Sequence, residues 1–196
     1  MTVNEIRQDI IDNKNGSNMG DILNSVIANT DTFDVSTGYF DVKGYDVLRK
    51  TLEQKITDTK FHMRLLMGKE AILTGKDSFE KYAMEYGQDV EDSLSLKSSI
   101  DGIELTKNSR RGITGLINLL KSDNVEVKMS KKRFNHSKCY ITKSAAFIGS
   151  SNFTAAGMAG NYELNAGIYS PLLINHTRDW FDSMWELGKP TKKELL

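Results

Sequence analysis

One stretch of the chain decides its fold: HSKCYITKSAAFIGSSN, at residues 136–152. Two runs rich in apolar and β-branched residues lie within it, 136–142 and 145–149, and only two polar residues separate them. Such runs are typical of β-strands, and so short a connection predicts that the two strands pair. A turn of small residues follows at 149–152, and a further strand is predicted over 162–169. Polar side chains therefore gather where strands of one sheet end.

The polar side chains in and after this stretch are those that phosphodiester chemistry without a metal needs. His136 carries an imidazole that can attack phosphorus, and Lys138 carries an ammonium that can neutralise a phosphate oxygen. Asn152 offers an amide for a second oxygen, and Glu163 offers a carboxylate that can orient the imidazole. Because residues i and i+2 of a strand point to the same face, we expect the imidazole and the ammonium to project into one pocket.

This ordered set of residues resembles the signature of the phospholipase D superfamily, which is His-x-Lys, then a Gly-Ser-x-Asn turn, then a glutamate. The matching residues are His136, Lys138, Gly149, Ser150, Asn152 and Glu163. The chain departs from the family pattern at Lys143, where the family usually carries an aspartate. The resemblance implies an α/β fold in which a mixed β-sheet is flanked by helices on both faces.

The same resemblance implies a role for each site residue. His136 is expected to be the nucleophile and to form a covalent phosphohistidine, while Lys138 and Asn152 bind phosphate oxygens. Glu163 is expected to hold the imidazole, and Ser150 to help bind the substrate through its hydroxyl. Neither a metal nor a cofactor is expected to take part.

Hydrophobic periodicity outside the motif predicts strands and helices in alternation. Strands are expected at 33–40, 61–67 and 125–129, with a short one after Asp101-Gly102, and helices at 19–27, 44–56, 79–86, 153–160 and around 180–185. Another helix is expected to start at a Ser109 cap and to bury a stripe through 113–120. This alternation predicts a mostly parallel or mixed sheet covered by helices on both faces, in agreement with the resemblance.

The distribution of charge points to an anionic substrate. The net charge is zero, yet no Asp or Glu occurs from Val127 to Ala159, a stretch that contains six Lys and Arg residues. A basic segment around the motif favours a phosphate-bearing substrate, with Lys132 and Arg133 as candidate contacts. The alternative is that residues 131–133 form a solvated turn.

Composition excludes several classes of protein. The single cysteine, Cys139, rules out an internal disulfide framework, and one Cys with three His makes no convincing zinc site. No apolar stretch is long enough to span a membrane, and the N-terminus lacks the features of a signal peptide. We expect a cytoplasmic protein without a membrane partner, and structural roles for His62 and His176.

A single copy of the motif is present, whereas a two-step displacement at phosphorus needs a nucleophile and a separate acid. Family members with one motif resemble two-fold homodimers in which each subunit supplies half of the site. We therefore expect a homodimer in which His136 of one subunit attacks and His136 of the other acts as the acid.

The leading hypothesis is a metal-independent endonuclease that cleaves DNA in restriction, defence or DNA processing. The expected partners are nucleic acid, DNA first, and a fused or associated helicase or DNA-recognition module. We expect one domain over 1–196, and residues 191–196 resemble the start of a helix, as in the N-terminal part of a longer protein. Two alternatives stay open: a phospholipase or phosphatidyl transferase, and a catalytically silent nucleic-acid-binding module.

Overall fold

The computed structural model describes residues 7–14, 18–68, 107–131, 133–192 and 195. Within these residues, eight strands form one mixed sheet in the order β1-β7-β6-β5-β2-β3-β4-β8. The strands are β1 (Ile10–Ile11), β2 (Thr32–Thr37), β3 (His62–Met67), β4 (Val125–Ser130), β5 (Lys138–Thr142), β6 (Ala146–Gly149), β7 (Asn165–Ile168) and β8 (Gly188–Pro190). The central strands β2, β3 and β4 run parallel, and all other neighbours pair antiparallel.

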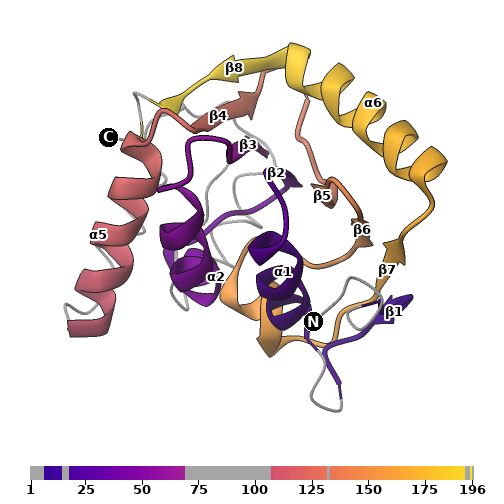
Figure 1. Cartoon of the computed structure of the whole chain (residues 1–196), viewed down its shortest axis with the longest axis horizontal. Helices are drawn as coiled ribbons and strands as arrows, with labels where there is room; N and C mark the ends of the chain where they lie inside the picture. The colour runs from indigo at the N-terminus through magenta and orange to yellow at the C-terminus, as the bar shows by residue number, and fades with distance from the viewer. Residues whose placement is uncertain (1–6, 15–17, 69–106, 132, 193–194, 196) are drawn as a thin grey trace, which may run out of the picture.

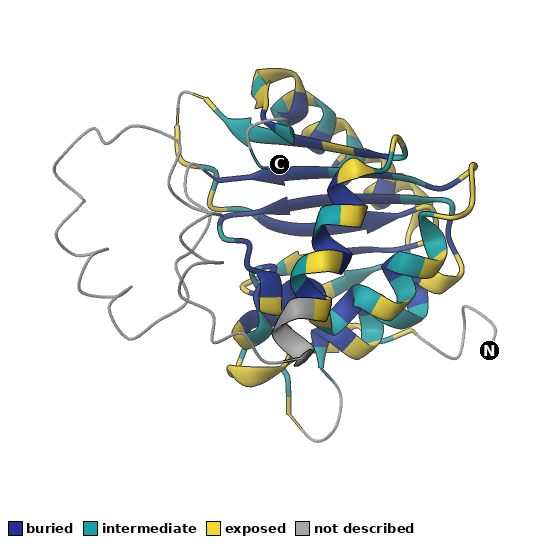
Figure 2. Ribbon diagram, turned by 90° about the vertical axis from the view of Figure 1, so that its left-hand side faces the viewer, coloured by how far each residue is buried: buried dark blue, intermediate teal, exposed yellow. Residues whose placement is uncertain are grey.

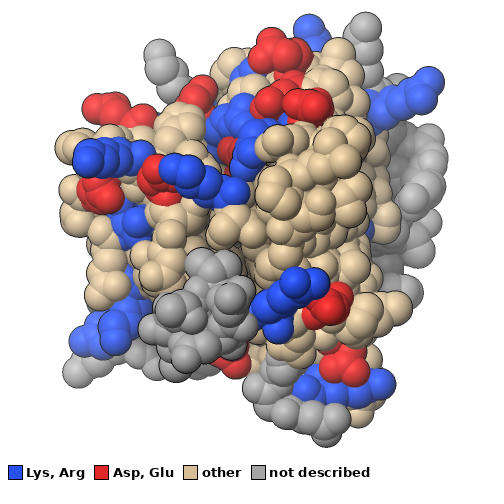
Figure 3. Space-filling model, turned by 45° about the vertical axis from the view of Figure 1, so that its right-hand side comes forward, with Lys and Arg blue, Asp and Glu red and all other residues tan. Residues whose placement is uncertain are grey.

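Helices cover both faces of this sheet, as Figures 1 and 2 show. Three of them, α1 (Met19–Ala28), α2 (Val42–Lys55) and α5 (Lys107–Lys121), lie on one face, where a short π-helix, η2 (Ala156–Gly160), also contacts α1 and α2. A single long helix, α6 (Pro171–Leu187), lies on the opposite face. The side of the molecule that carries α6 includes a broad area without charged side chains (Figure 3).

Each face has its own apolar core. Buried side chains of α1, α2 and α5, such as Leu23, Leu48 and Leu116, pack on Val35 and Tyr140 of the sheet. On the other face, residues of α6 pack on Leu66, Cys139 and Ile141. The lone cysteine, Cys139, is therefore a buried packing residue.

The start of α2 fixes the turn that carries Asn152. The α2 N-cap Asp41 accepts a hydrogen bond from the backbone N of Gly44, and the backbone N of Asp41 donates to the carbonyl of Phe153 at 3.1 Å. A Cβ atom at Gly44 would lie 2.5 Å from that same carbonyl oxygen, so only glycine allows this approach. Helix α2 is thus held directly against the polypeptide that follows the Gly-Ser-Ser-Asn turn.

The structure confirms the mixed α/β fold and the pairing of the two motif strands. Several helices and strands begin or end at residues other than those predicted. The first motif strand begins at Lys138 rather than at His136, because its partner β2 ends at Thr37, the residue paired with Lys138. The strand predicted over 162–169 is limited to β7, so Glu163 precedes it. Helix α5 begins at Lys107, which places Ser109 in its first turn and not at its cap.

Some predicted elements lie outside the described residues or have another helix type, and some observed strands were not predicted. The helix predicted at 79–86 and the strand predicted after Asp101-Gly102 lie outside the described residues. The short helix predicted at 153–160 is the π-helix η2. Strands β1 and β8 were not predicted, because two or three residues are too few to show a period of two.

Candidate active site

His136 and Lys138 do not project side by side from one strand. His136 lies in the segment just before β5, and the buried side chain of Lys138 turns back so that Nζ donates to the backbone carbonyl of His136 at 2.8 Å. The ammonium of Lys138 therefore lies next to the backbone of His136, the residue that carries the imidazole. The prediction that His136 lies on the strand was wrong, because β5 begins at Lys138, but the two residues are neighbours in space and the charge of Lys138 acts on the His136 imidazole.

Two aromatic rings flank the imidazole of His136. The ring of Phe134 lies 5.5 Å from it and that of Tyr39 lies 6.2 Å from it, centroid to centroid. Phe134 and Tyr39 also contact each other, at 5.5 Å. The nucleophile candidate is thus held beside an apolar surface, part of which is exposed on Phe134.

Gly38, directly after β2, brings the imidazole and the Asn152 amide together. A Cβ atom built at Gly38 would lie 3.1 Å from Cδ2 of His136 and 3.4 Å from Oδ1 of Asn152. Both side chains therefore contact the same space beside the Cα atom of Gly38, which a Cβ atom would fill. The Oδ1 atom of Asn152 accepts a hydrogen bond from the backbone N of Tyr39 at 3.2 Å, which orients the amide.

A second asparagine holds the Gly-Ser-Ser-Asn turn in place. The amide oxygen of Asn165 accepts from the backbone N of Ser151 at 3.1 Å, and its nitrogen donates to the Ser151 hydroxyl and to the carbonyl of Ile11. Gly149 allows β7 to come close, since a Cβ atom there would lie 2.3 Å from the carbonyl oxygen of Leu164. Sequence reasoning gave Asn165 no role, although a buried amide on a strand must find hydrogen-bond partners.

Glu163 is held by its neighbours in its own chain. Its Oε2 atom accepts from the Ser150 hydroxyl, and its Oε1 atom accepts from the side-chain amide of Asn161 at 3.5 Å. The Ser150 hydroxyl also accepts from the backbone N of Leu164. Ser150 therefore positions the carboxylate, and within the described part of the chain that carboxylate does not reach the His136 ring.

The charges of the site favour a neutral imidazole. Partial burial lowers the pKa of His136, and the positive charge of Lys138 lowers it further. Burial also lowers the pKa of Lys138, while the Glu163 carboxylate opposes that shift. The lowered pKa means that the imidazole stays neutral to a lower pH than an ordinary histidine, and the neutral ring is the form with a free nitrogen lone pair.

Replacing Lys138 with methionine is expected to raise the pKa of His136. The substitution removes the positive charge that disfavours the imidazolium, so the ring binds a proton more readily and the titration moves to higher pH. The measurement is an NMR pH titration of the His136 ring protons in both proteins, with the other two imidazoles as internal references. A His136 titration that is the same in both would contradict this electrostatic coupling.

The basic segment before the site is compatible both with a solvated turn and with contacts to a phosphate-bearing substrate. Lys131 and Arg133 are exposed, and the salt bridges found among the described residues involve neither of them. The placement of Lys132 lies outside the described residues. Exposed cations next to the candidate site are compatible with a solvated turn and with a contact to a polyanion.

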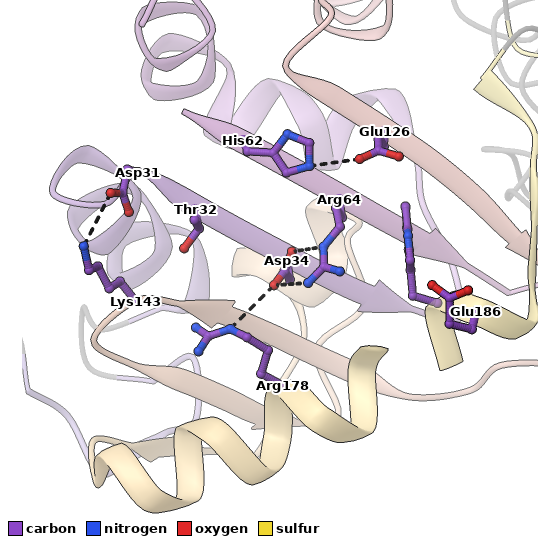
Figure 4. Close-up of a pocket in the computed structure, with 10 residues that line it drawn as sticks. Asp31, Thr32, Asp34, His62, Arg64, Glu126, Lys143, Arg178 and Glu186 are labelled. Atoms are coloured by element: carbon purple, nitrogen blue, oxygen red, sulfur yellow. Dashed lines mark hydrogen bonds and ion pairs between the residues drawn. The ribbon is translucent and has the colours of Figure 1, made fainter. Parts of the chain in front are cut away.

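A separate cavity of about 570 Å³ lies toward the starts of β2, β3 and β4, away from His136 (Figure 4). Asp34 there makes a bidentate ion pair with Arg64, at 2.7 and 2.8 Å, and Arg178 of α6 lies 3.9 Å from it. Lys143, the departure from the family pattern, also lines this cavity and lies 3.5 Å from Asp31. The departure therefore sits at the far end of β5 from the candidate active site.

Neither a metal site nor a membrane span is found in the described parts of the chain. No three or more His, Cys, Asp or Glu residues among them are grouped so as to hold a metal ion. None of the helices described is both long and apolar enough to cross a membrane.

Comparison with known proteins identifies a family model that matches most of the chain. The family model described as "Cardiolipin synthase, PLD-like domain" matches residues 23–185. No curated protein sequence matches the chain.

Several solved structures share the fold. Nuc from Salmonella typhimurium, a phospholipase D family member, is 14% identical with a TM-score of 0.58, and the match covers 92% of this chain and 95% of Nuc. NucT from Helicobacter pylori is 14% identical with a TM-score of 0.52, over 87% of this chain and 89% of NucT. Phosphatidylserine synthase from Haemophilus influenzae is 12% identical with a TM-score of 0.56, over 93% of this chain and 38% of the synthase. At these identities the likeness shows the fold alone.

Proposed function

The chain belongs to the phospholipase D-like family, and we propose that it is a metal-independent endonuclease that cleaves DNA. The observation that carries the proposal is the arrangement around Gly38, where the imidazole of His136 and the amide of Asn152 come close together, while the buried Lys138 donates to the backbone carbonyl of His136. These three groups are a nucleophile and two phosphate-oxygen ligands in one place.

The reaction follows from these groups. A ring nitrogen of neutral His136 attacks phosphorus, a P–N bond forms, and the P–O bond to the leaving strand breaks. Lys138 and the Asn152 amide stabilise the charge on the non-bridging oxygens during this step. Water then attacks phosphorus and gives a proton to the group that protonated the leaving strand, the P–N bond breaks, and the product phosphate leaves while His136 is regenerated.

The leaving oxygen needs a proton, which one copy of the site does not supply. Glu163 is bound to Ser150 and Asn161, and in the described chain no carboxylate holds the His136 ring. We therefore propose a homodimer with a shared active site, in which the second His136 acts as the acid and Glu163 of the second copy meets the first imidazole.

Two features support DNA as the substrate. Exposed Lys131 and Arg133 can bind backbone phosphates, and the exposed ring of Phe134 beside His136 offers a surface on which an unpaired base can stack. The proposal extends to a role in restriction, defence or DNA processing in the cytoplasm, with a fused or associated helicase or DNA-recognition module. The second candidate is a phosphatidyl transferase, favoured by the family model's description, and it would use the same catalytic groups.

A substrate panel in excess EDTA tests the proposed function. Single-stranded DNA, double-stranded DNA, bis(p-nitrophenyl) phosphate and vesicles of phosphatidylglycerol are each incubated with the protein. Cleavage of DNA and of the small diester without a metal is the expected result. Turnover of the phospholipid alone would replace the nuclease with the transferase, and no turnover of any substrate would favour a silent binding module.

Within this panel, Phe134→Ala is expected to lower kcat/KM for single-stranded DNA by about 5- to 100-fold, because stacking contributes about 1–3 kcal/mol per base. Cleavage of bis(p-nitrophenyl) phosphate should change little, since that substrate has no base to stack. An equal loss on both substrates would mean that Phe134 acts on the geometry of His136 and not on the base.

A further inference from the structure

Three polar side chains form a closed ring of hydrogen bonds around the residues that flank His136. The amide nitrogen of Asn135 donates to Oγ of Ser36 at 2.8 Å, and the Ser137 hydroxyl donates to the amide oxygen of Asn135 at 2.6 Å. The Oγ atoms of Ser36 and Ser137 lie 2.6 Å apart and close the ring. This hydroxyl–amide ring therefore joins strand β2 to the residue on each side of the candidate nucleophile.

The chemistry of the three groups determines the direction of each hydrogen bond. The backbone N of Ser137 donates to Oδ1 of Asn135 at 3.2 Å, so the amide oxygen, and not the amide nitrogen, faces Ser137. A hydroxyl has a single proton, and Ser137 gives its proton to Asn135, so the Ser36 hydroxyl is the donor between the two serines. Each side chain thus donates one hydrogen bond within the ring and accepts another, and removing one member leaves the other two each without a partner.

The hydroxyl–amide ring begins where the backbone pairing of β2 and β5 ends. The register of these strands ends at the Thr37–Lys138 pair, so His136 lies beyond it. The backbone before His136 also packs on the end of β3, since a Cβ atom built at Gly68 would lie 2.8 Å from the carbonyl oxygen of Asn135. Side-chain hydrogen bonds consequently continue the attachment to β2 at the point where the chain carries the imidazole.

Two consecutive residues of β2 hold the two halves of the candidate active site. Ser36 lies on the α6 face of the sheet, because it pairs with Cys139 of the core under that helix. Thr37 faces the other way, and its hydroxyl accepts from the backbone N of Phe153 at 3.0 Å, directly after the amide of the site. Both residues are 0% exposed. One rigid strand thus fixes the candidate nucleophile and the phosphate-binding turn relative to each other.

We propose that Ser36, Asn135 and Ser137 are positioning residues for phosphodiester cleavage, and that the hydroxyl–amide ring holds the backbone of His136 so that its imidazole stays beside the Asn152 amide. The inference rests on the proposed function. Ser36 is completely buried and cannot touch a substrate, so its effect must pass through the backbone of its partners. The ring should therefore act on the rate of the bond-forming step and leave substrate binding unchanged.

Ser36→Ala opens the hydroxyl–amide ring at its buried member. It is expected to lower kcat for bis(p-nitrophenyl) phosphate in excess EDTA by about 10- to 100-fold with little change in KM, because a small displacement of a reacting group is costly. Asn124→Ala is the control, since Asn124 donates to the carbonyls of Ile56 and Asp58 before β4, away from the site. An equal fall in kcat in both variants would overturn the proposal.

A pair of variants of equal shape at Ser137 isolates the hydroxyl. Ser137→Thr keeps the hydroxyl and should retain a kcat near that of the wild type, whereas Ser137→Val lacks it and should lose about as much as Ser36→Ala. The double variant Ser36→Ala with Ser137→Val should lose little more than either single variant, because one substitution already opens the ring. Equal kcat values for Ser137→Thr and Ser137→Val would overturn the role of the hydroxyl.

The NMR signals of the His136 ring protons give a readout that needs no activity. The rings of Phe134 and Tyr39 lie against the imidazole, so their ring currents make these signals sensitive to its position. Ser36→Ala and Ser137→Val should shift the signals, whereas Ser137→Thr and Asn124→Ala should leave them in place. Signals that stay in place in Ser36→Ala and Ser137→Val would overturn the positioning role. Signals that shift as expected in a protein that cleaves no substrate would keep the ring and overturn only the nuclease activity.

Discussion

His136→Ala is expected to lower the rate of phosphodiester cleavage by about 10⁴-fold or more, because the substitution removes the atom that forms the bond to phosphorus. No neighbouring group can replace it: Lys138 donates to a backbone carbonyl and the Asn152 amide is not a nucleophile. The measurement is the cleavage of DNA and bis(p-nitrophenyl) phosphate in excess EDTA. The loss should be similar for both substrates, since the nucleophile acts on each.

The matched control is His62→Ala. His62 lies at the start of β3, where it pairs with Glu126 at 3.0 Å, so its loss leaves the candidate active site unchanged. A second readout is the covalent intermediate: acid-labile phosphate bound to the wild-type protein after rapid quenching should be absent from His136→Ala. Cleavage by His136→Ala near the wild-type rate would place the nucleophile elsewhere.

Asp34→Asn is expected to be the most destabilising of the substitutions considered. The Asp34 side chain is 6% exposed and holds Arg64 through two hydrogen bonds, while Arg64 in turn stacks 4.8 Å from the Phe181 ring centroid. Losing the carboxylate charge leaves that guanidinium partly buried with only Asp182 as an anionic partner. We expect a loss of about 2–4 kcal/mol in the free energy of unfolding, since breaking a buried ion pair is costly.

Urea and thermal unfolding measure this loss, and the expected fall in Tm is roughly 5–15 °C for a chain of this length. Asp179→Asn, an exposed acid on α6, is the control and should stay within about 0.5 kcal/mol of the wild type. If Asp34→Asn matched that control, the Asp34–Arg64 pair would contribute nothing to stability and α6 would be held by its apolar core alone.

Local sequence was sufficient for the elements that surround the motif. The runs at 136–142 and 145–149 pair as predicted, and their alternation with helices gave the mixed α/β class. Period and propensity act within a few residues, so such elements can be read from a single sequence. The start of β5 was misplaced, because it is set by where β2 ends, and β2 lies about a hundred residues earlier in the chain.

In the candidate site too, local sequence identifies the chemical groups, whereas their arrangement depends on distant segments of the chain. Local spacing was enough to identify the chemical groups of the site, since His136, Lys138, Asn152 and Glu163 occur in a recognisable order. Their arrangement depends on Gly38 and Tyr39, which no motif marks, and which the sheet brings against His136 and Asn152. That contact exists only because β2 pairs antiparallel with β5.

The partner of Glu163 and the exposure of the nearby apolar side chains depend on tertiary contacts. The sequence predicts that a strand carboxylate needs a hydrogen-bond partner, and in the fold that partner is Ser150, not His136. Likewise, Ile148, Leu173 and Trp180 are apolar side chains that the fold leaves exposed. Hydrophobic pattern fixes which side of an element is apolar, whereas the crossing of one element over another decides how much of that side is covered.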